Sequence, residues 1–256
     1  MSALLETRGL SKTFGGLKAV QNVDLRVGAN RIVSVIGPNG AGKTTFFNCL
    51  SGIYCPDGGE ILLDGQNIAG RKPHQICRLG MSRTFQNIRL FPEMTVLENV
   101  LVAQFQHRSL SPFPLLFRSP KFCGSEQECR EEALGFLDFV GLRAHADRVS
   151  SSLAYGQQRR LEIARALATK PRLLLLDEPA AGMNPQEAVE MVQLISRIRE
   201  RGLAILLIEH HMKVVMTISD EILVLDHGVP IAHGAPEQVR NDPQVIRAYL
   251  GEEITN

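Results

Sequence analysis

One short segment constrains the fold of this chain more than any other. Residues 37–45 read GPNGAGKTT, with an apolar run, Arg31 to Ile36, before them and a helical pattern, Thr45 to Leu50, after them. A glycine-rich turn between a strand and a helix, closed by Lys and Thr, is the pattern of a phosphate-binding loop. The segment therefore predicts an α/β fold in which strand, loop and helix follow one another.

The residues of this loop have separate roles. Glycines let the backbone curve so that its N–H groups point at the phosphates, Lys43 brings a positive charge toward the β- and γ-phosphates, and the Thr44 hydroxyl is a ligand for Mg²⁺. A glycine-rich turn without a ligand is the alternative, and the flanking strand and helix disfavour it. We expect the bound phosphates to contact the whole loop, which is made of Gly37, Pro38, Asn39, Gly40, Ala41, Gly42, Lys43, Thr44 and Thr45.

A second segment places two carboxylates at the end of a buried strand. Leu173 to Leu176 is apolar at every position, and Asp177 and Glu178 follow. A strand covered on both faces is typical of parallel sheets, and its carboxyl end opens into the crevice where ligands bind. Such a pair suits Mg²⁺ binding and the activation of water. Capping of a helix is the alternative role for Glu178.

A third segment, LAYGQQ at residues 153–158, opens a helical stretch that leads into the same strand. A small turn at a helix start presents backbone N–H groups and the positive end of the helix dipole, and so favours a phosphate. With the three segments in this order, the chain resembles the nucleotide-binding subunits of ABC transporters over nearly its whole length. Its runs AYGQQRRLEIARALA, LLLLDEPAAGMNP and IEHHM and its ending RAYLGEE are most similar to the ATP-binding subunits of bacterial branched-chain amino acid importers.

The resemblance implies roles for particular residues. Glu178 is the catalytic base, and His210 contacts the γ-phosphate, with His211 as its neighbouring alternative. Gln86 senses Mg²⁺ and nucleotide and is a candidate hinge. Phe14 stacks on adenine, with burial in the core as the alternative. The implied catalytic group is Glu178, His210, Lys43 and Gln86, and the implied metal ligands are Thr44, Gln86 and Asp177.

The resemblance also implies ATP and Mg²⁺ as cofactors and a second ABC ATPase subunit as a partner. The signature residues of one subunit would cover the ATP held by the loop of the other, and they are Ala154, Tyr155, Gly156 and Gln157. Two of them depart from the common Leu-Ser-Gly-Gly-Gln signature, because Ala154 lacks a hydroxyl and Tyr155 replaces a glycine. Asn184 stands where many relatives have Asp.

The pattern along the chain predicts one ABC ATPase domain over residues 1–256. Residues 1–86 and 161–256 are expected to form a core with a mixed sheet and an antiparallel β subdomain, and residues 87–160 an inserted helical subdomain. The expected strands are Leu4–Leu10, Val20–Val27, Arg31–Ile36, Glu60–Leu63, Leu173–Glu178, Leu203–Glu209 and Glu221–Asp226. Helices are expected at Thr95–Phe105 and Glu126–Val140, with a proline-containing loop, Ser111–Ser125, between them.

Composition limits the location and the partners. The 28 Lys and Arg nearly balance the 27 Asp and Glu, which disfavours a nucleic acid partner. Five cysteines without a C-x-x-C pair fit a reduced, intracellular setting. No signal peptide or membrane-spanning run is evident. We expect a peripheral protein on the cytoplasmic face of the inner membrane, bound to two membrane-spanning permease subunits and, through them, to a substrate-binding protein.

Several alternatives stay open from the sequence. Related ATPases energise urea, amide or lipopolysaccharide transport, and some soluble ABC ATPases do not serve transport at all. A small-molecule kinase is a third class, which has no use for the signature. Apolar residues in Phe91–Met94 and Phe113–Phe117 are expected to dock a helix of a membrane subunit, and closure of the helical subdomain's own core is the alternative.

Overall fold

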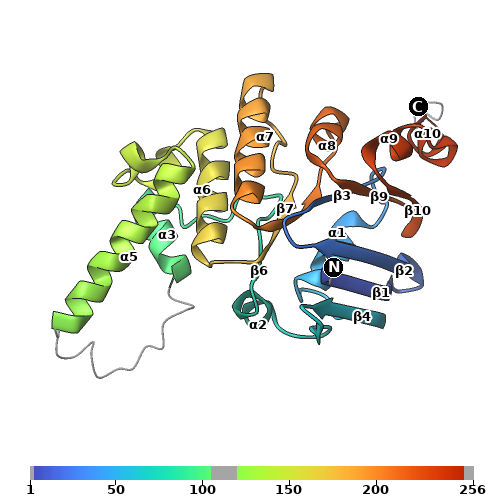
Figure 1. The fold of residues 1–256 in the computed structure, drawn as a ribbon, viewed down its shortest axis with the longest axis horizontal. Coiled ribbons are helices and arrows are strands. Elements are labelled where there is room, and N and C mark those ends of the chain that lie inside the picture. The colour runs from blue at the N-terminus through green and yellow to red at the C-terminus, as the bar shows by residue number, and fades with distance from the viewer. Residues whose placement is uncertain (1–2, 105–119, 251–256) are drawn as a thin grey trace. The chain divides into compact units, whose positions relative to one another are not determined.

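The computed structural model describes residues 3–104 and 120–250, and residues 120–125 and 250 are described by their backbone alone. The chain forms two compact units (Figure 1). The first unit is Met1–Arg83 with Arg172–Asn256, and the second is Thr84–Pro171. Helix α6, Tyr155–Ala168, is unbroken. The predicted return to the core at residue 161 therefore falls inside this helix, and the second unit extends to Pro171.

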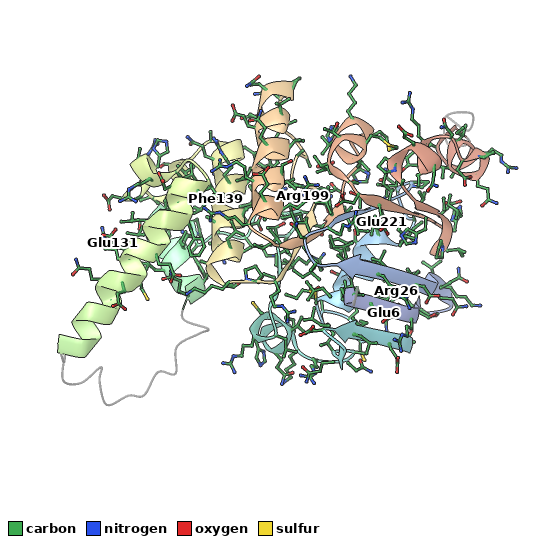
Figure 2. All side chains as sticks on the ribbon, in the orientation of Figure 1. Glu6, Arg26, Glu131, Phe139, Arg199 and Glu221 are labelled. Carbon is green, nitrogen blue, oxygen red and sulfur yellow. The ribbon has the colours of Figure 1, made fainter. Side chains whose placement is uncertain are left out.

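An antiparallel sheet begins the first unit. Its order is β2-β1-β4-β5, with bounds Ala3–Phe14 (β1), Leu17–Gly28 (β2), Gly58–Leu63 (β4) and Gln66–Asn67 (β5). Glu6 and Arg26 face each other across β1 and β2, and their Oε1 and Nη2 atoms are 2.8 Å apart (Figure 2). The expected antiparallel subdomain is confirmed, and its strands are longer than predicted.

A six-stranded sheet completes the first unit, in the order β10-β9-β3-β8-β7-β6. The strands span Ile32–Ile36 (β3), Met81–Arg83 (β6), Leu173–Asp177 (β7), Ala204–Ile208 (β8), Glu221–Asp226 (β9) and Val229–Gly234 (β10). All neighbours are parallel except β10, which pairs antiparallel with β9. Every residue of β3, β7 and β8 is buried, as expected for strands covered on both faces.

Helices cover the two faces of this mixed sheet. Helix α1, Lys43–Leu50, packs Phe46 and Phe47 into the core that the two sheets share. On β9 the side chains alternate, so that Leu223 and Leu225 face that core while Ile222 and Val224 face the opposite side. That side is covered by α8 (Met212–Ile218), α9 (Pro236–Arg240) and α10 (Pro243–Leu250) (Figure 1). Helices α2, Pro73–Arg78, and α7, Pro185–Glu200, complete the unit.

The second unit is helical, as predicted. Helices α3, Val96–Gln104, and α5, Pro120–Phe139, pack against each other and against α6, and short 3₁₀ turns, η2 (Arg143–His145) and η3 (Ser150–Ser152), follow α5. The predicted loop Ser111–Ser125 is wrong from residue 120 onward, because α5 begins at Pro120, a position at which proline suits a helix. Its earlier part, with Phe113–Phe117, lies outside the described residues. None of the helices within the described residues is long and apolar enough to cross a bilayer.

Candidate functional site

The glycine-rich loop joins β3 to α1 in a conformation that only glycine fits at two points. Gly37 has φ +148° and Gly42 has φ +95°, both in the left-handed range. A Cβ at Gly37 would lie 2.0 Å from the Leu225 carbonyl oxygen, and one at Gly42 would lie 2.1 Å from that of Ala19. Neighbouring backbone therefore fixes the course of the loop from two sides.

Lys43 is the first residue of α1, and its side chain folds back along the loop. Its ammonium group is buried and donates to the carbonyl oxygens of Gly37 at 2.6 Å and Pro38 at 2.8 Å. Gly42 caps α1 without a side-chain acceptor, and Thr44 is exposed. The loop thus has a cation at its centre and a hydroxyl at the helix start, as a phosphate site requires.

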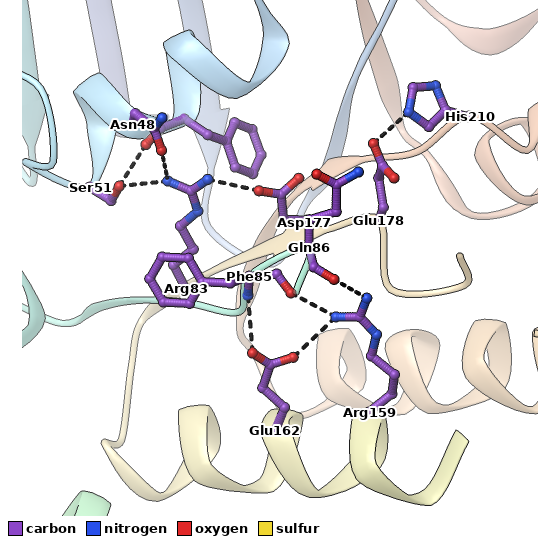
Figure 3. Close-up of polar contacts among 11 residues, drawn as sticks. Asn48, Ser51, Arg83, Phe85, Gln86, Arg159, Glu162, Asp177, Glu178 and His210 are labelled. Carbon is purple, nitrogen blue, oxygen red and sulfur yellow. Dashed lines mark hydrogen bonds and ion pairs between the residues drawn. The ribbon is translucent and has the colours of Figure 1, made fainter. Parts of the chain in front are cut away.

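Asp177 ends strand β7 and is paired with a residue that the sequence analysis missed. Arg83, at the end of the adjacent β6, donates through Nη2 to Asp177 Oδ2 at 2.7 Å (Figure 3). Its Nη1 donates to Asn48 Oδ1 and to Ser51 Oγ on the α1 side, at 2.8 Å each. Because both charged side chains are nearly fully buried, this pair couples the Asp177 carboxylate, which was predicted to bind a metal, to the helix that follows the phosphate loop.

Glu178 adopts a backbone conformation that is rare for a residue with a side chain. Its φ is +49°, and its N–H donates to the Ile208 carbonyl at 2.9 Å. Glu178 Oε1 lies 2.5 Å from Nε2 of His210, which follows β8 (Figure 3). The capping alternative is wrong, since the next helix begins at Pro185 and is capped by Asn184.

A second carboxylate beside this pair was not given a role from the sequence. Glu209 is 1% exposed, and its Oε1 accepts from Ala180 N–H at 2.9 Å. Its Oε2 accepts from the N–H groups of His210 at 2.9 Å and His211 at 3.2 Å. Glu209 therefore fixes the turn after β7 to the turn after β8, which carries His210.

The signature lies in the second unit, at the start of α6. Ala154 caps the helix and supplies no side-chain acceptor, while its own N–H donates to Gln157 Oε1 at 3.2 Å. The Tyr155 hydroxyl accepts from Arg159 Nη2 at 3.0 Å, and the same nitrogen donates to the carbonyl of Gln86. The tyrosine that replaces a signature glycine is thus tied to Arg159.

Phe14 lies at the end of β1 and is not part of the core. The residue is 40% exposed, and its ring meets that of Tyr54 edge to face, with centroids 5.2 Å apart. Lys12 Nζ lies 5.3 Å from the Phe14 centroid and donates to Asp57 at 2.7 Å. The alternative of a buried Phe14 is therefore wrong, and the exposed ring is available for stacking.

The parallel sheet brings most of the predicted site together. In the order β3-β8-β7, the carboxyl ends carry the phosphate loop, His210 and the Asp177–Glu178 pair at one edge. Gln86 and the signature belong to the second unit. No group of three or more His, Cys, Asp or Glu that could hold a metal occurs among the described residues. A hydroxyl at Thr44 and a carboxylate at Asp177 are the hard oxygen ligands that suit Mg²⁺ together with phosphate oxygens.

Arg83, Arg159 and Glu209 escaped the sequence analysis because their partners lie elsewhere in the chain or on its backbone. Arg83 is 94 positions from Asp177. Glu209 carried one local signal, a charge directly after the five buried residues of β8. A carboxylate in such a place is buried only with partners, so its position alone predicts a set of hydrogen bonds.

Comparison with known proteins identifies the family. An ABC transporter model matches residues 20–181, and a model described as a branched-chain amino acid ATP-binding cassette transporter matches residues 229–255. The chain is 55% identical, over 97% of its length and 98% of theirs, to the high-affinity branched-chain amino acid transport ATP-binding proteins BraF of Pseudomonas aeruginosa and LivG of Escherichia coli K12. It is also similar to a solved ATP-binding cassette of an ABC transporter in its ADP conformation, with 33% identity, a TM-score of 0.86 and coverage of 98% of this chain and 100% of that one. The site geometry and these similarities lead to one conclusion: the chain belongs to the ABC transporter family and is an ABC ATPase with the P-loop fold.

Proposed function

We propose that this protein hydrolyses MgATP to power a membrane importer of branched-chain amino acids. The observation that carries the proposal is the meeting of the phosphate loop, Asp177, and the Glu178–His210 pair at one edge of a parallel sheet. The amino acid substrate is supported by the names of BraF and LivG. An ATPase of a urea, amide or lipopolysaccharide transporter is the alternative within the family.

The proposed chemistry follows from the residues at this edge. Backbone N–H groups of the loop and the ammonium group of Lys43 bind the β- and γ-phosphates. Thr44 and Asp177, with Gln86 from the second unit, are the proposed ligands of Mg²⁺, which when bound neutralises phosphate charge. Glu178 Oε1 accepts a proton from the attacking water, and His210, whose Nε2 is 2.5 Å away, orients that carboxylate and contacts the γ-phosphate.

The proposed working form is a head-to-tail pair of cassettes. Ala154 to Gln157 of one subunit would cover the γ-phosphate held by the loop of the other, because the N–H groups at the start of α6 favour an anion. The second cassette is an identical or a related chain. The pair would lie on the cytoplasmic face of the inner membrane against two permease subunits. A substrate-binding protein would deliver the transported substrate to these permease subunits.

A surface in the second unit suits the permease subunits. Phe91 and Met94 are 41% and 37% exposed, so these two side chains do not close a core as the alternative required. Where exposed apolar side chains form a contiguous patch, they mark sites of contact with a partner. We propose that they dock a helix of a permease subunit.

Two measurements test the proposal. The purified subunit, assembled with its permease partners in vesicles, should hydrolyse MgATP and take up leucine, isoleucine or valine. Lys43→Ala should abolish both activities, since the β- and γ-phosphate charge loses its cation. ATP hydrolysis with transport of urea or an amide instead would support the alternative substrate, whereas wild-type turnover by Lys43→Ala would overturn the assignment of the phosphate loop.

A further inference from the structure

The signature helix holds the backbone of the segment that contains Gln86. Glu162 Oε1 accepts from Phe85 N–H at 3.2 Å, and Arg159 Nη1 donates to the Phe85 carbonyl at 2.6 Å (Figure 3). Arg159 Nη2 donates to the Gln86 carbonyl. Arg159 and Glu162 also pair with each other at 3.3 Å, and their side chains are only 3% and 7% exposed. Two buried side chains of α6 thus hold three backbone groups of two consecutive residues, Phe85 and Gln86.

The same face of α6 reaches both the signature and the chain beyond Gln86. Arg159 Nε and Nη2 donate to the Tyr155 hydroxyl at 3.2 Å and 3.0 Å, one helical turn earlier. Arg165, further along the helix, donates to the carbonyl of Arg89 and lies 5.0 Å from the ring centroid of Phe91. The segment from Phe85 to Phe91 therefore lies against α6 along its length.

Arg83, two residues before Phe85, is fixed in the first unit instead. Its guanidinium group is bound to Asp177, Asn48 and Ser51, all of which belong to that unit. The boundary between the units falls between Arg83 and Thr84. Thr84 thus separates a residue anchored to the sheet from a residue anchored to α6.

We propose that Arg159 and Glu162 are positioning residues that bind Gln86 to the signature helix, so that Gln86 and the signature move as one body while the chain turns at the Arg83–Thr84 junction. This places the hinge before Gln86 and not at it. The inference rests on the proposed ATPase function. Its consequence is that a change sensed by the Gln86 side chain at one nucleotide is passed directly to the signature that covers the nucleotide of the second cassette.

The contacts of Arg159 and Glu162 with the backbone of Phe85 and Gln86 are called the clamp below. Amide hydrogen exchange in the intact subunit tests the clamp without reference to activity. Arg159→Lys keeps the charge but loses the planar fork that spans two carbonyls, and Glu162→Ala removes the acceptor for Phe85 N–H. Each should speed exchange at the Phe85 amide by about tenfold, as expected when one charge-assisted hydrogen bond is lost. The matched control is Arg143→Lys, at an exposed arginine of the same unit, which should leave exchange at the Phe85 amide unchanged. Unchanged exchange at Phe85 in Arg159→Lys and Glu162→Ala would overturn the proposal.

A double-mutant cycle in the assembled transporter tests whether Arg159 acts through Gln86. We expect Arg159→Lys to lower kcat by about tenfold with little change in KM for ATP. In a Gln86→Ala background the same change should cause no further loss, because there is no side chain left to position. A kcat of the double variant that is reduced by the product of the two single reductions would contradict the proposal. If Arg159→Lys fails to fold, Tyr155→Phe takes its place in the exchange experiment. Loss of the hydroxyl that accepts from Arg159 should also speed exchange at Phe85, and unchanged exchange would contradict the clamp. Absence of ATPase activity in the wild-type transporter would contradict the proposed function. The exchange experiment would still test whether the clamp exists, because it does not depend on activity.

Discussion

At the scale of single residues, the exposed ring of Phe14 carries a direct prediction about the nucleotide. Phe14→Ala should weaken ATP binding by about 1 to 3 kcal/mol, the range for loss of a base stacked on an aromatic ring. Triphosphate without a base should bind the variant and the wild type equally, as isothermal titration would measure. Equal weakening for both ligands would instead give Phe14 a structural role.

Cys49, near the end of α1, is buried, unlike Cys55, Cys77 and Cys129, the other thiols whose side chains the structure describes. Desolvation raises its pKa to about 11. Since the pKa in the folded protein lies above the ordinary value of 9.0, stability that this thiol contributes at neutral pH is lost as the pH rises through about 11. At pH 8 Cys49 should react with iodoacetamide far more slowly than exposed Cys55, as mass spectrometry would show. Equal rates would contradict the burial.

At the scale of elements, the start of α7 depends on a reciprocal cap. Asn184 Oδ1 accepts from Glu187 N–H, and Glu187 Oε2 accepts from Asn184 N–H, both at 3.0 Å. Asn184→Ala should lower the free energy of unfolding by about 1 kcal/mol in urea denaturation, while Asn184→Asp, which keeps the acceptor, should stay close to wild type. An unchanged midpoint for Asn184→Ala would show that the cap contributes nothing to stability.

The buried bond between β6 and β7 should contribute more than that cap. Arg83→Met leaves the buried Asp177 carboxylate without its cation and should lower the free energy of unfolding by about 3 to 5 kcal/mol. Arg83→Lys keeps the charge but not the planar guanidinium group that also reaches Asn48 and Ser51. Its free energy of unfolding should therefore decrease less than that of Arg83→Met. Equal stability of Arg83→Met and wild type in guanidinium unfolding would contradict the role given to this pair.

Helices and strands could be predicted from the sequence where the signal for them is local. A glycine loop between a strand and a helix, and a run of buried leucines, each depend on neighbouring residues, so β3, α1 and β7 were found with small shifts at their ends. The bonds of Arg83 and Arg159 depend on which segments meet in the fold, and no spacing along the chain encodes them. The prediction of a loop at Pro120 was wrong because proline is tolerated in the first turn of a helix, although it interrupts a helix further along.

At the scale of the whole molecule, the residues proposed for one catalytic cycle are divided between two units of the same chain. The first unit holds the phosphate loop, Asp177, Glu178 and His210, and the second holds Gln86 and the signature. If each signature covers the nucleotide of a second cassette, two sites form together and loss of the γ-phosphate contacts opens the pair. The opening of the pair is the conformational change that would be transmitted to the permease subunits.

The size and turnover of Glu178→Gln with Mg²⁺ and ATP test this central claim most directly. The amide keeps the shape of the side chain but cannot take a proton from water, so turnover should fall by about 10² or more while ATP still binds. The cassettes should then accumulate as closed dimers in light scattering, alone or with their permease subunits, and the wild type should not. A variant that stays monomeric and uncoupled in both settings, or that hydrolyses ATP at the wild-type rate, would contradict the sandwich mechanism with Glu178 as its base.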